Sequence, residues 1–493
     1  MARSITVILV HGWSVYNTNT YCKLPARLKA EAQRTINLDI EFREIWLGKY
    51  VSFQDEVKLP DLARGFEAAI NRELADIINE GKRFVVITHS TGGPVIRLWW
   101  HNYYQKSNKP CPMSHLIMLA PANFGSALAQ LGKSRLSRIK TWFERVEPGQ
   151  GVLDWLELGS PESWELNRQW ITGTSDPSGL PSPVFIFTLT GQTIDRKLYD
   201  NLNTYTGELG SDGVVRVAAA NLNANYVSIK QQHSPNSNLE IGIAESKASP
   251  RTAFKLIAGR SHSGEEKGIM RSIQNDNKAH PTISALLECL SVENSAQYAH
   301  LADSFDAQNE NLRNDELVET ATDLLLKRYF IHDRMSMLII RVMDHIGFPV
   351  LDYDFMLLGT GNDPNKLPPD FFKDRQRNSR SKNTLTYFVN FDILKGCLAI
   401  KNPSNRRKAL RPDQTGVGEF GIEISPRPQD GYVYYVTAML AAGQDHLSTL
   451  LKPDQTTLVD IELQRRVGRG VFELTTNEGP EDFRKQPVGN PVD

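Results

Sequence analysis

Buried apolar runs alternate with an amphipathic helical pattern along the first 290 residues of the chain. Short, nearly continuous apolar runs are typical of parallel strands that are covered on both faces. Residues 61–78 instead repeat their apolar positions with a period close to 3.6, which predicts a helix packed by one face on a sheet. The strand-like runs cover residues 5–10, 38–45, 84–87, 115–120, 184–190 and 254–258. This alternation predicts an α/β fold built on a parallel sheet.

The pattern changes beyond residue 330, where short strand-like runs are separated by Gly, Pro, Asn and Asp. These runs cover residues 336–343, 353–358, 385–391, 420–424, 432–437, 457–463 and 471–475. Such spacing predicts an all-β sandwich. The polar, acidic stretch that precedes them suits a linker or a surface helix.

The chain of 493 residues is long enough for two or three domains, because single cores rarely grow beyond roughly 250–300 residues. We predict an α/β domain over residues 1–290 and a linker or helical connection over 291–330. A β-sandwich accessory domain is predicted over 331–476, with a flexible tail over 477–493 that is rich in Pro, Gly and charge. Within the first domain, the periodicity breaks down over residues 127–183. That segment contains Trp142, Trp155, Trp164 and Trp170.

Composition limits the kinds of molecule that the protein is expected to bind. A net charge of -1, with 40% hydrophobic and 23% charged residues, gives no electrostatic case for binding nucleic acid. The four cysteines lie far apart and form no metal or redox pattern. The apolar run over 5–10 is too short for a signal peptide, and no segment approaches the roughly 20 apolar residues of a membrane span. We therefore expect synthesis in the cytoplasm, with any export by a route that lacks a cleaved N-terminal signal.

Ser90 stands where a predicted strand meets a predicted helix, in the stretch Thr88-His89-Ser90-Thr91-Gly92-Gly93. In a nucleophile elbow, a strained turn at this place exposes the serine hydroxyl, and the next backbone N–H faces the developing oxyanion. The usual pattern is Gly-x-Ser-x-Gly, and here Thr88 replaces the first glycine. A serine that only caps a helix is the alternative interpretation.

Two more residues follow in the chain order nucleophile, acid, base. Asp212 lies in a glycine-flanked turn, with Asp195 and Asp200 as alternatives for the acid. His262 follows the strand over 254–258 and is our candidate for the general base. Other histidines match this position less well, namely His89, His233 and His280.

The stretch Thr88–Gly93, together with the loop Pro121-x-x-x-Gly125-Ser126, resembles lipases of the α/β-hydrolase superfamily over about the first 290 residues. The elbow is most similar to the subset that includes inositol deacylases of lipid anchors and related bacterial lipases and phospholipases, which share the departure at Thr88. The resemblance implies an α/β-hydrolase fold with a helical cap over 127–183, followed here by the all-β sandwich-like domain. It also implies an oxyanion hole, for which Thr91 and Trp13 are the candidate N–H donors.

We therefore expect a serine carboxylic-ester hydrolase that acts on a lipid or phospholipid through Ser90, Asp212 and His262, by way of an acyl-enzyme. No metal or organic cofactor is required for this chemistry. The cap tryptophans could line an acyl-chain cleft or touch a lipid surface, or they could simply pack the cap onto the body. Membrane-surface contact through the sandwich is an expectation by analogy alone.

Other hypotheses stay open from the sequence. The same triad could serve a deacylase, a thioesterase or a soluble esterase, and a non-catalytic interaction protein could be built on a hydrolase scaffold. The layout also resembles lipase effectors delivered between bacteria by type VI secretion machines, which would imply a delivery partner and an immunity protein. Asp352 and Asp354 are weak evidence for calcium, because further oxygen ligands are missing nearby in the sequence.

Overall fold

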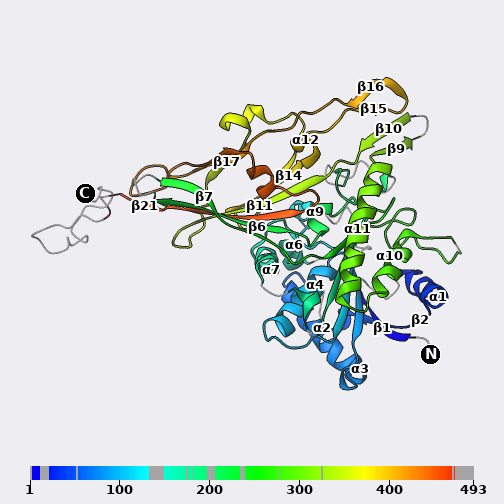
Figure 1. Ribbon diagram of the computed structural model, residues 1–493. Coiled ribbons are helices and arrows are strands. Elements are labelled where there is room, and N and C mark those ends of the chain that lie inside the picture. The colour runs from blue at the N-terminus through cyan, green and yellow to red at the C-terminus, as the bar shows by residue number, and fades with distance from the viewer. Residues whose placement is uncertain are drawn as a thin grey trace, which may run out of the picture.

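Two large β-sheets organise the molecule, one in the lower part of Figure 1 and one crossing above it. The computed structural model describes residues 3–11, 21–50, 54–132, 149–173, 176–180, 182–196, 206–233, 239–276, 278–323, 326–468 and 471. The candidate oxyanion donor Trp13, the alternative acid Asp200, the cap residue Trp142 and the tail over 477–493 lie outside these residues.

The first sheet is parallel throughout and has the strand order β2-β1-β3-β4-β5-β8. Its strands are β1 (Arg3–His11), β2 (Leu38–Trp46), β3 (Phe84–His89), β4 (Met113–Leu119), β5 (Phe185–Thr190) and β8 (Ala253–Leu256). The strand order reverses next to β1, and in open α/β sheets the carboxyl ends of strands at such a point are where ligands bind. The α/β class expected from the sequence is therefore confirmed, and β3 carries Ser90 to this edge.

Helices cover both faces of the first sheet because its strands are apolar on both sides. Val7 and Leu9 of β1 join one buried cluster, and Ile8 and Val10 join the other, as the two-residue alternation of a strand requires. The first cluster is completed by α1 (Leu24–Ile36), α10 (Pro281–Leu290) and α11 (Ser295–Asp315). The second is completed by α2 (Leu59–Glu73), α3 (Ala75–Asn79), α4 (Gly92–Trp100), α6 (Gln150–Leu156) and α7 (Pro161–Thr172).

The helix α11 lies within residues 291–330, for which a linker or a helical connection was predicted. Its Tyr298 hydroxyl donates to the Ile186 carbonyl of β5 at 2.6 Å and accepts from the Ala253 amide of β8 at 3.2 Å. Phe305 is fully buried in the same cluster. Residues 295–315 therefore form a helix that packs on β5 and β8 of the first sheet. Their polar side chains obscured this in the sequence, because only one narrow stripe of the helix is apolar.

The second sheet has the order β13-β14-β11-β20-β6-β7 and takes strands from both halves of the chain. Its strands are β6 (Asn225–His233), β7 (Leu239–Ala248), β11 (Met335–Asp344), β13 (Phe372–Arg377), β14 (Thr384–Asn390) and β20 (Thr456–Leu463). β6 pairs in parallel with β20, more than 200 residues later in the chain. The predicted domain over 1–290 is therefore not self-contained, because its β6–β7 hairpin completes the second sheet.

A third sheet packs on one face of the second and makes a sandwich. It has the order β12-β17-β19, and its strands are β12 (Tyr353–Leu358), β17 (Phe420–Pro426) and β19 (Ala438–Gly443). Leu338 and Ile340 of β11 lie in the buried cluster between the two sheets, whereas Met337 and Ile339 lie in the cluster that contains the cap and α4. The second sheet is therefore covered on both faces, by the sandwich core and by the first domain.

Short elements complete the fold. Two-stranded sheets are formed by β9 (Val318–Asp323) with β10 (Leu326–Ile331), β15 (Ile400–Asn402) with β16 (Asn405–Arg411), and β18 (Val433–Tyr434) with β21 (Arg466–Val467). The remaining α-helices of the described chain are α9 (Val217–Ala220), α12 (Phe391–Lys395) and α13 (His446–Leu450). Within the described ranges, no helix combines the length and the apolar character needed to cross a membrane.

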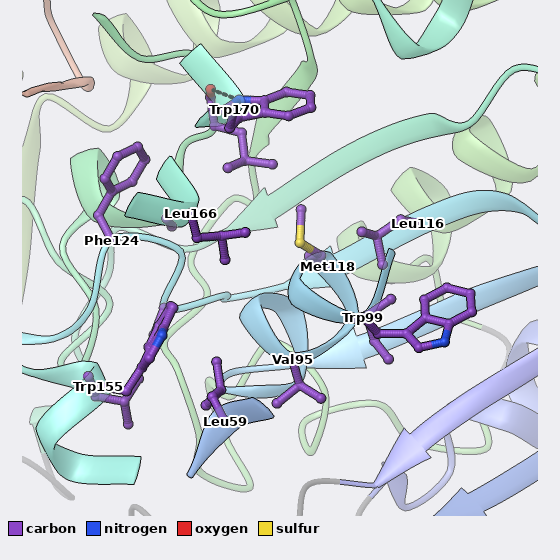
Figure 2. Close-up of a cluster of buried hydrophobic side chains, with 14 of the residues drawn as sticks. Leu59, Val95, Trp99, Leu116, Met118, Phe124, Trp155, Leu166 and Trp170 are labelled. Atoms are coloured by element: carbon purple, nitrogen blue, oxygen red, sulfur yellow. Dashed lines mark hydrogen bonds between the residues drawn. The ribbon is translucent and has the colours of Figure 1, made fainter. Parts of the chain in front are cut away.

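The described tryptophans of the cap are buried. Trp155, Trp164 and Trp170 expose 3%, 2% and 9% of their surface, and Figure 2 shows Trp155 and Trp170 among side chains of α2, α4 and β4. The indole of Trp170 donates to the Leu222 carbonyl at 3.0 Å. The guanidinium of Arg341 on β11 lies 4.6 Å from the ring centre of Trp164. These three rings pack the cap against the body and the second sheet, which is the second of the two roles considered from the sequence.

The side chain of His115 on β4 makes stability depend on pH. Its ring is buried beside Phe187, with 5.9 Å between ring centres, and its Nε2 donates to the Val292 carbonyl at 2.9 Å. Burial lowers the pKa of His115 from 6.5 to about 4. Between these values the unfolded chain holds a proton that the folded protein does not, so the free energy of unfolding decreases as the pH falls.

We expect His115 to contribute a slope of at most about 1.4 kcal/mol per pH unit in this window. The variant His115→Gln keeps a donor for the Val292 carbonyl but cannot titrate. Denaturant unfolding of both proteins between pH 7.5 and pH 4.5 checks this, and the variant should show the shallower dependence. Equal slopes would contradict the assignment.

Candidate active site

Ser90 occupies a strained turn between β3 and α4. Its φ angle is 54°, which lies in the left-handed region that residues other than glycine and asparagine seldom adopt. The Ser90 N–H donates to the Leu119 carbonyl at 3.0 Å, and the Ser90 carbonyl accepts from the Gly93 N–H at 3.2 Å. These bonds hold the serine at the carboxyl end of the sheet in the conformation of a nucleophile elbow.

The glycines after Ser90 are needed because α4 crowds the ends of β3 and β4. A Cβ atom on Gly93 would lie 2.8 Å from the Pro121 Cβ, and one on Gly92 would lie 3.1 Å from the Thr88 Cβ. Because Gly92 has no side chain, the space beside it is free for the Thr88 side chain. Threonine can therefore stand at position 88, where the Gly-x-Ser-x-Gly pattern usually has its first glycine. The Thr91 N–H stands at the N-terminus of α4, where no carbonyl of the preceding turn can accept it.

Asp212 lies at the tip of a tight turn and is fully buried. One carboxylate oxygen, Oδ1, accepts from the backbone amides of Val214 at 3.0 Å and Val215 at 2.8 Å. The other, Oδ2, faces Nδ1 of His262 at 3.0 Å. The turn amides therefore hold the carboxylate in one orientation and leave its second oxygen for the imidazole.

His262 bridges the two groups. Its Nε2 lies 3.1 Å from the Ser90 Oγ, its Nδ1 lies 3.0 Å from the Asp212 carboxylate, and its backbone N–H donates to the Asp212 carbonyl at 2.9 Å. Because an ionised carboxylate only accepts, Nδ1 carries the proton and Nε2 is free to accept from the serine hydroxyl. The structure thus brings together the three residues that the sequence singled out.

His89 contacts the backbone of the loop that carries His262 and does not take the position of the candidate base. Its Nε2 faces the backbone carbonyl of His262 at 3.2 Å, so it donates there, and the two rings lie 4.8 Å apart between centres. Burial, followed by the nearby His262, lowers the pKa of His89 to about 3. His89 is therefore neutral near neutral pH, and its contact with the His262 carbonyl is structural.

The other candidates lie elsewhere. Asp195 is buried beyond β5, but the Nδ1 of His262 faces Asp212 instead. His233 ends β6 in the second sheet, and His280 caps the N-terminus of α10 by accepting from the Thr282 N–H. Asp352 and Asp354 both pair with Arg427. Among the residues that the structure describes, no cluster of three or more His, Cys, Asp and Glu side chains could hold a metal ion.

A buried arginine that the sequence analysis missed ties the cap to the elbow helix. Arg97 of α4 donates to the Asn123 side chain at 3.3 Å and to the Asn167 side chain of α7 at 3.0 Å. The Asn167 amide in turn donates to the Asn123 carbonyl at 2.9 Å. Burial lowers the pKa of Arg97 to about 9. No local pattern marks these residues, because the contacts join three separate segments of the chain.

Comparison with known proteins gives one clear relationship. The chain matches the solved structure of phospholipase PlaB from Legionella pneumophila with 40% sequence identity and a TM-score of 0.85, over 100% of both chains. A structure of the same phospholipase in complex with thio-NAD matches with 40% identity and a TM-score of 0.83, over 99% of this chain and 100% of that one. No family model and no curated protein matches the chain.

Proposed function

This chain belongs to the family of the Legionella pneumophila phospholipase PlaB, and from that premise we propose that it hydrolyses carboxylic esters of phospholipids with Ser90 as nucleophile. It is a serine ester hydrolase of the lipase and phospholipase class. The observation that carries the choice of residues is the position of His262, within 3.1 Å of the Ser90 hydroxyl and 3.0 Å of the Asp212 carboxylate.

The proposed reaction proceeds in two halves. His262 Nε2 takes the hydroxyl proton while Ser90 Oγ attacks the ester carbonyl, and the N–H groups of Thr91 and Trp13 stabilise the oxyanion. His262 then gives the proton to the leaving alkoxide, so a lysophospholipid departs and an acyl-serine remains. Water, deprotonated by the same histidine, releases the fatty acid and regenerates Ser90. Asp212 keeps the ring oriented and stabilises the imidazolium in both halves.

The rival hypotheses differ in their support. The contacts among Ser90, His262 and Asp212 argue against a scaffold without catalysis, since such a protein has no need of an aligned base. The burial of Trp155, Trp164 and Trp170 removes these side chains as support for membrane contact through the cap. A delivery partner, an immunity protein and export by a route without a cleaved signal stay predictions from the sequence.

Mass spectrometry of lipid vesicles tests the proposal. Vesicles of mixed phosphatidylcholine, phosphatidylglycerol and triacylglycerol are incubated with the protein, and the products are identified. Fatty acid together with lysophospholipid is the expected result, and the position of the remaining acyl chain shows which ester is cleaved. Fatty acid from triacylglycerol alone would make the protein a neutral lipase. No release, with a fluorophosphonate still labelling Ser90, would point to a deacylase or soluble esterase.

A further inference from the structure

A buried ion cluster joins the loop that carries Asp212 to the second sheet. Arg216, four residues after Asp212, exposes 2% of its surface. Its Nε and Nη2 donate to the two carboxylate oxygens of Glu208 at 2.7 and 2.9 Å, and Nη2 also donates to Asp374 of β13. The guanidinium lies 4.2 Å from the ring centre of Phe388 on β14. One side chain therefore connects segments that are 158 residues apart.

The loop itself is closed at its base by Arg216. Ser211 and Arg216 form an antiparallel bridge, and the Val217 N–H donates to the Gly210 carbonyl at 2.8 Å. The Ser211 hydroxyl donates to the Glu208 carbonyl at 2.6 Å. Arg216 is thus the last residue of the hairpin that presents Asp212.

The second sheet also forms a wall against this hairpin. A Cβ atom on Gly210 would lie 2.4 Å from the Met335 Cγ and 3.2 Å from the Phe388 Cζ, and the φ angle of Gly210 is +77°. Asp374 and Phe388 lie opposite each other in the β13–β14 pairing. The ion pair and the ring contact therefore come from one cross-strand pair of the sheet, beside the base of the hairpin that carries Asp212.

The charges in the cluster are unbalanced, with one cation between two carboxylates. Burial raises the pKa of Glu208 despite the opposing effect of Arg216. Burial lowers the pKa of Arg216, but the carboxylates of Glu208 and Asp374 outweigh it and the net shift is upward. Arg216 therefore stays charged, and Glu208 and Asp374 both accept from the Nε and Nη2 edge of its guanidinium.

We propose that the second sheet is part of the catalytic apparatus, because Asp374 and Phe388 fix Arg216 and thereby place the Asp212 carboxylate against His262. Arg216 and Asp374 are positioning residues, since neither touches the reacting atoms. This inference rests on the proposed Ser90–His262–Asp212 chemistry. A displacement of the acid by about 1 Å is enough to lower the rate by one to two orders of magnitude.

The chain offers a matched control. Arg313 of α11 donates to Asp454, a residue in the turn before β20, so this pair also joins the first domain to the later part of the chain. Both pairs are largely buried, with side-chain exposures of 2% and 16% for Arg216 and Asp374, and of 9% and 14% for Arg313 and Asp454. Among the described hydrogen bonds, the Asp454 carboxylate pairs with Arg313, whereas its backbone N–H donates to the Met335 carbonyl at 2.7 Å and its carbonyl accepts from the Asn221 side chain at 2.9 Å. Asn suits position 454, where φ is 58°.

The experiment compares Asp374→Asn, Arg216→Lys and Asp454→Asn with the wild-type protein, using a soluble short-chain ester so that binding to lipid surfaces plays no part. We expect Asp374→Asn and Arg216→Lys to lower kcat and the rate of fluorophosphonate labelling about tenfold with KM unchanged. Asp454→Asn should lower the thermal unfolding midpoint by as much as Asp374→Asn while leaving kcat within about twofold of wild type.

Wild-type kcat in Asp374→Asn would overturn the inference, and so would equal losses of kcat in the two aspartate variants, since those would reflect a structural role. Ser90→Ala is included in the same series. If that variant hydrolyses the ester, the proposed function fails as well. If it is inactive and Asp374→Asn is fully active, only the inference about the second sheet fails.

Discussion

Replacing Ser90 by alanine is expected to lower kcat for phospholipid hydrolysis on the order of 10⁴-fold or more, leaving only the contribution of binding and the oxyanion donors. Among the described contacts, the nucleophilic group that lies within hydrogen-bond distance of His262 Nε2 is the Ser90 hydroxyl, at 3.1 Å. Its loss removes the covalent intermediate, whereas the left-handed turn that holds residue 90 accepts alanine with little added strain. Fatty acid release from vesicles, followed by mass spectrometry, measures the effect.

Thr91→Ala is the matched control for this prediction. It deletes the neighbouring hydroxyl but keeps the backbone N–H at the start of α4 that we assign to the oxyanion. We expect its kcat to stay within about tenfold of wild type, because the oxyanion donor is main chain. Comparable losses in both variants would contradict Ser90 as the single nucleophile and would point to damage to the elbow.

Asp212→Asn is expected to reduce kcat on the order of 10³–10⁴-fold with little change in stability, because the amide is nearly isosteric with the carboxylate. An asparagine amide facing His262 Nδ1 would favour the tautomer that carries its proton on Nε2. That tautomer cannot accept the proton of Ser90, and the imidazolium formed during the reaction loses its anion. Steady-state kinetics on a soluble ester, with the rate of fluorophosphonate labelling alongside, report this loss directly.

Asp195→Asn separates the two candidates for the acid. Asp195 is buried near the end of β5, so a purely structural cost of neutralising a buried carboxylate appears in both variants. We expect Asp195→Asn to retain kcat within about tenfold of wild type. An inactive Asp195→Asn beside an active Asp212→Asn would transfer the role of the acid to Asp195.

The proposed catalytic residues were accessible to sequence reasoning because each lies after a strand, in a stretch with a local signature. Ser90 follows an apolar run and precedes two glycines, Asp212 sits in a glycine turn, and His262 follows the last strand of the sheet. These are short-range patterns that reflect strand, turn and helix propensities. The chain order of nucleophile, acid and base then selected among the alternatives, and the contacts of His262 agree with that selection.

The division into domains was less accessible. No strand was predicted over residues 225–248, where the structure has β6 and β7, and nothing local in this stretch says which sheet it joins. Their partner β20 lies more than 200 residues later in the chain. Similarly, a linker or a surface helix was predicted for the segment of α11, and its packing on β5 and β8 depends on a stripe that includes Tyr298 and Phe305. Both features depend on contacts between segments that are distant in the sequence.

The sequence by itself determined the strands of the first sheet, the turn at Ser90 and the candidate residues of the proposed triad. These features follow from periodicity and turn chemistry, which act over a few neighbouring residues. Only the tertiary structure decided that β6 and β7 complete the second sheet, that Arg97 ties the cap to α4, and that Asp374 reaches Arg216. Such contacts depend on which buried faces and charges meet once the chain has folded, and no local pattern encodes that choice.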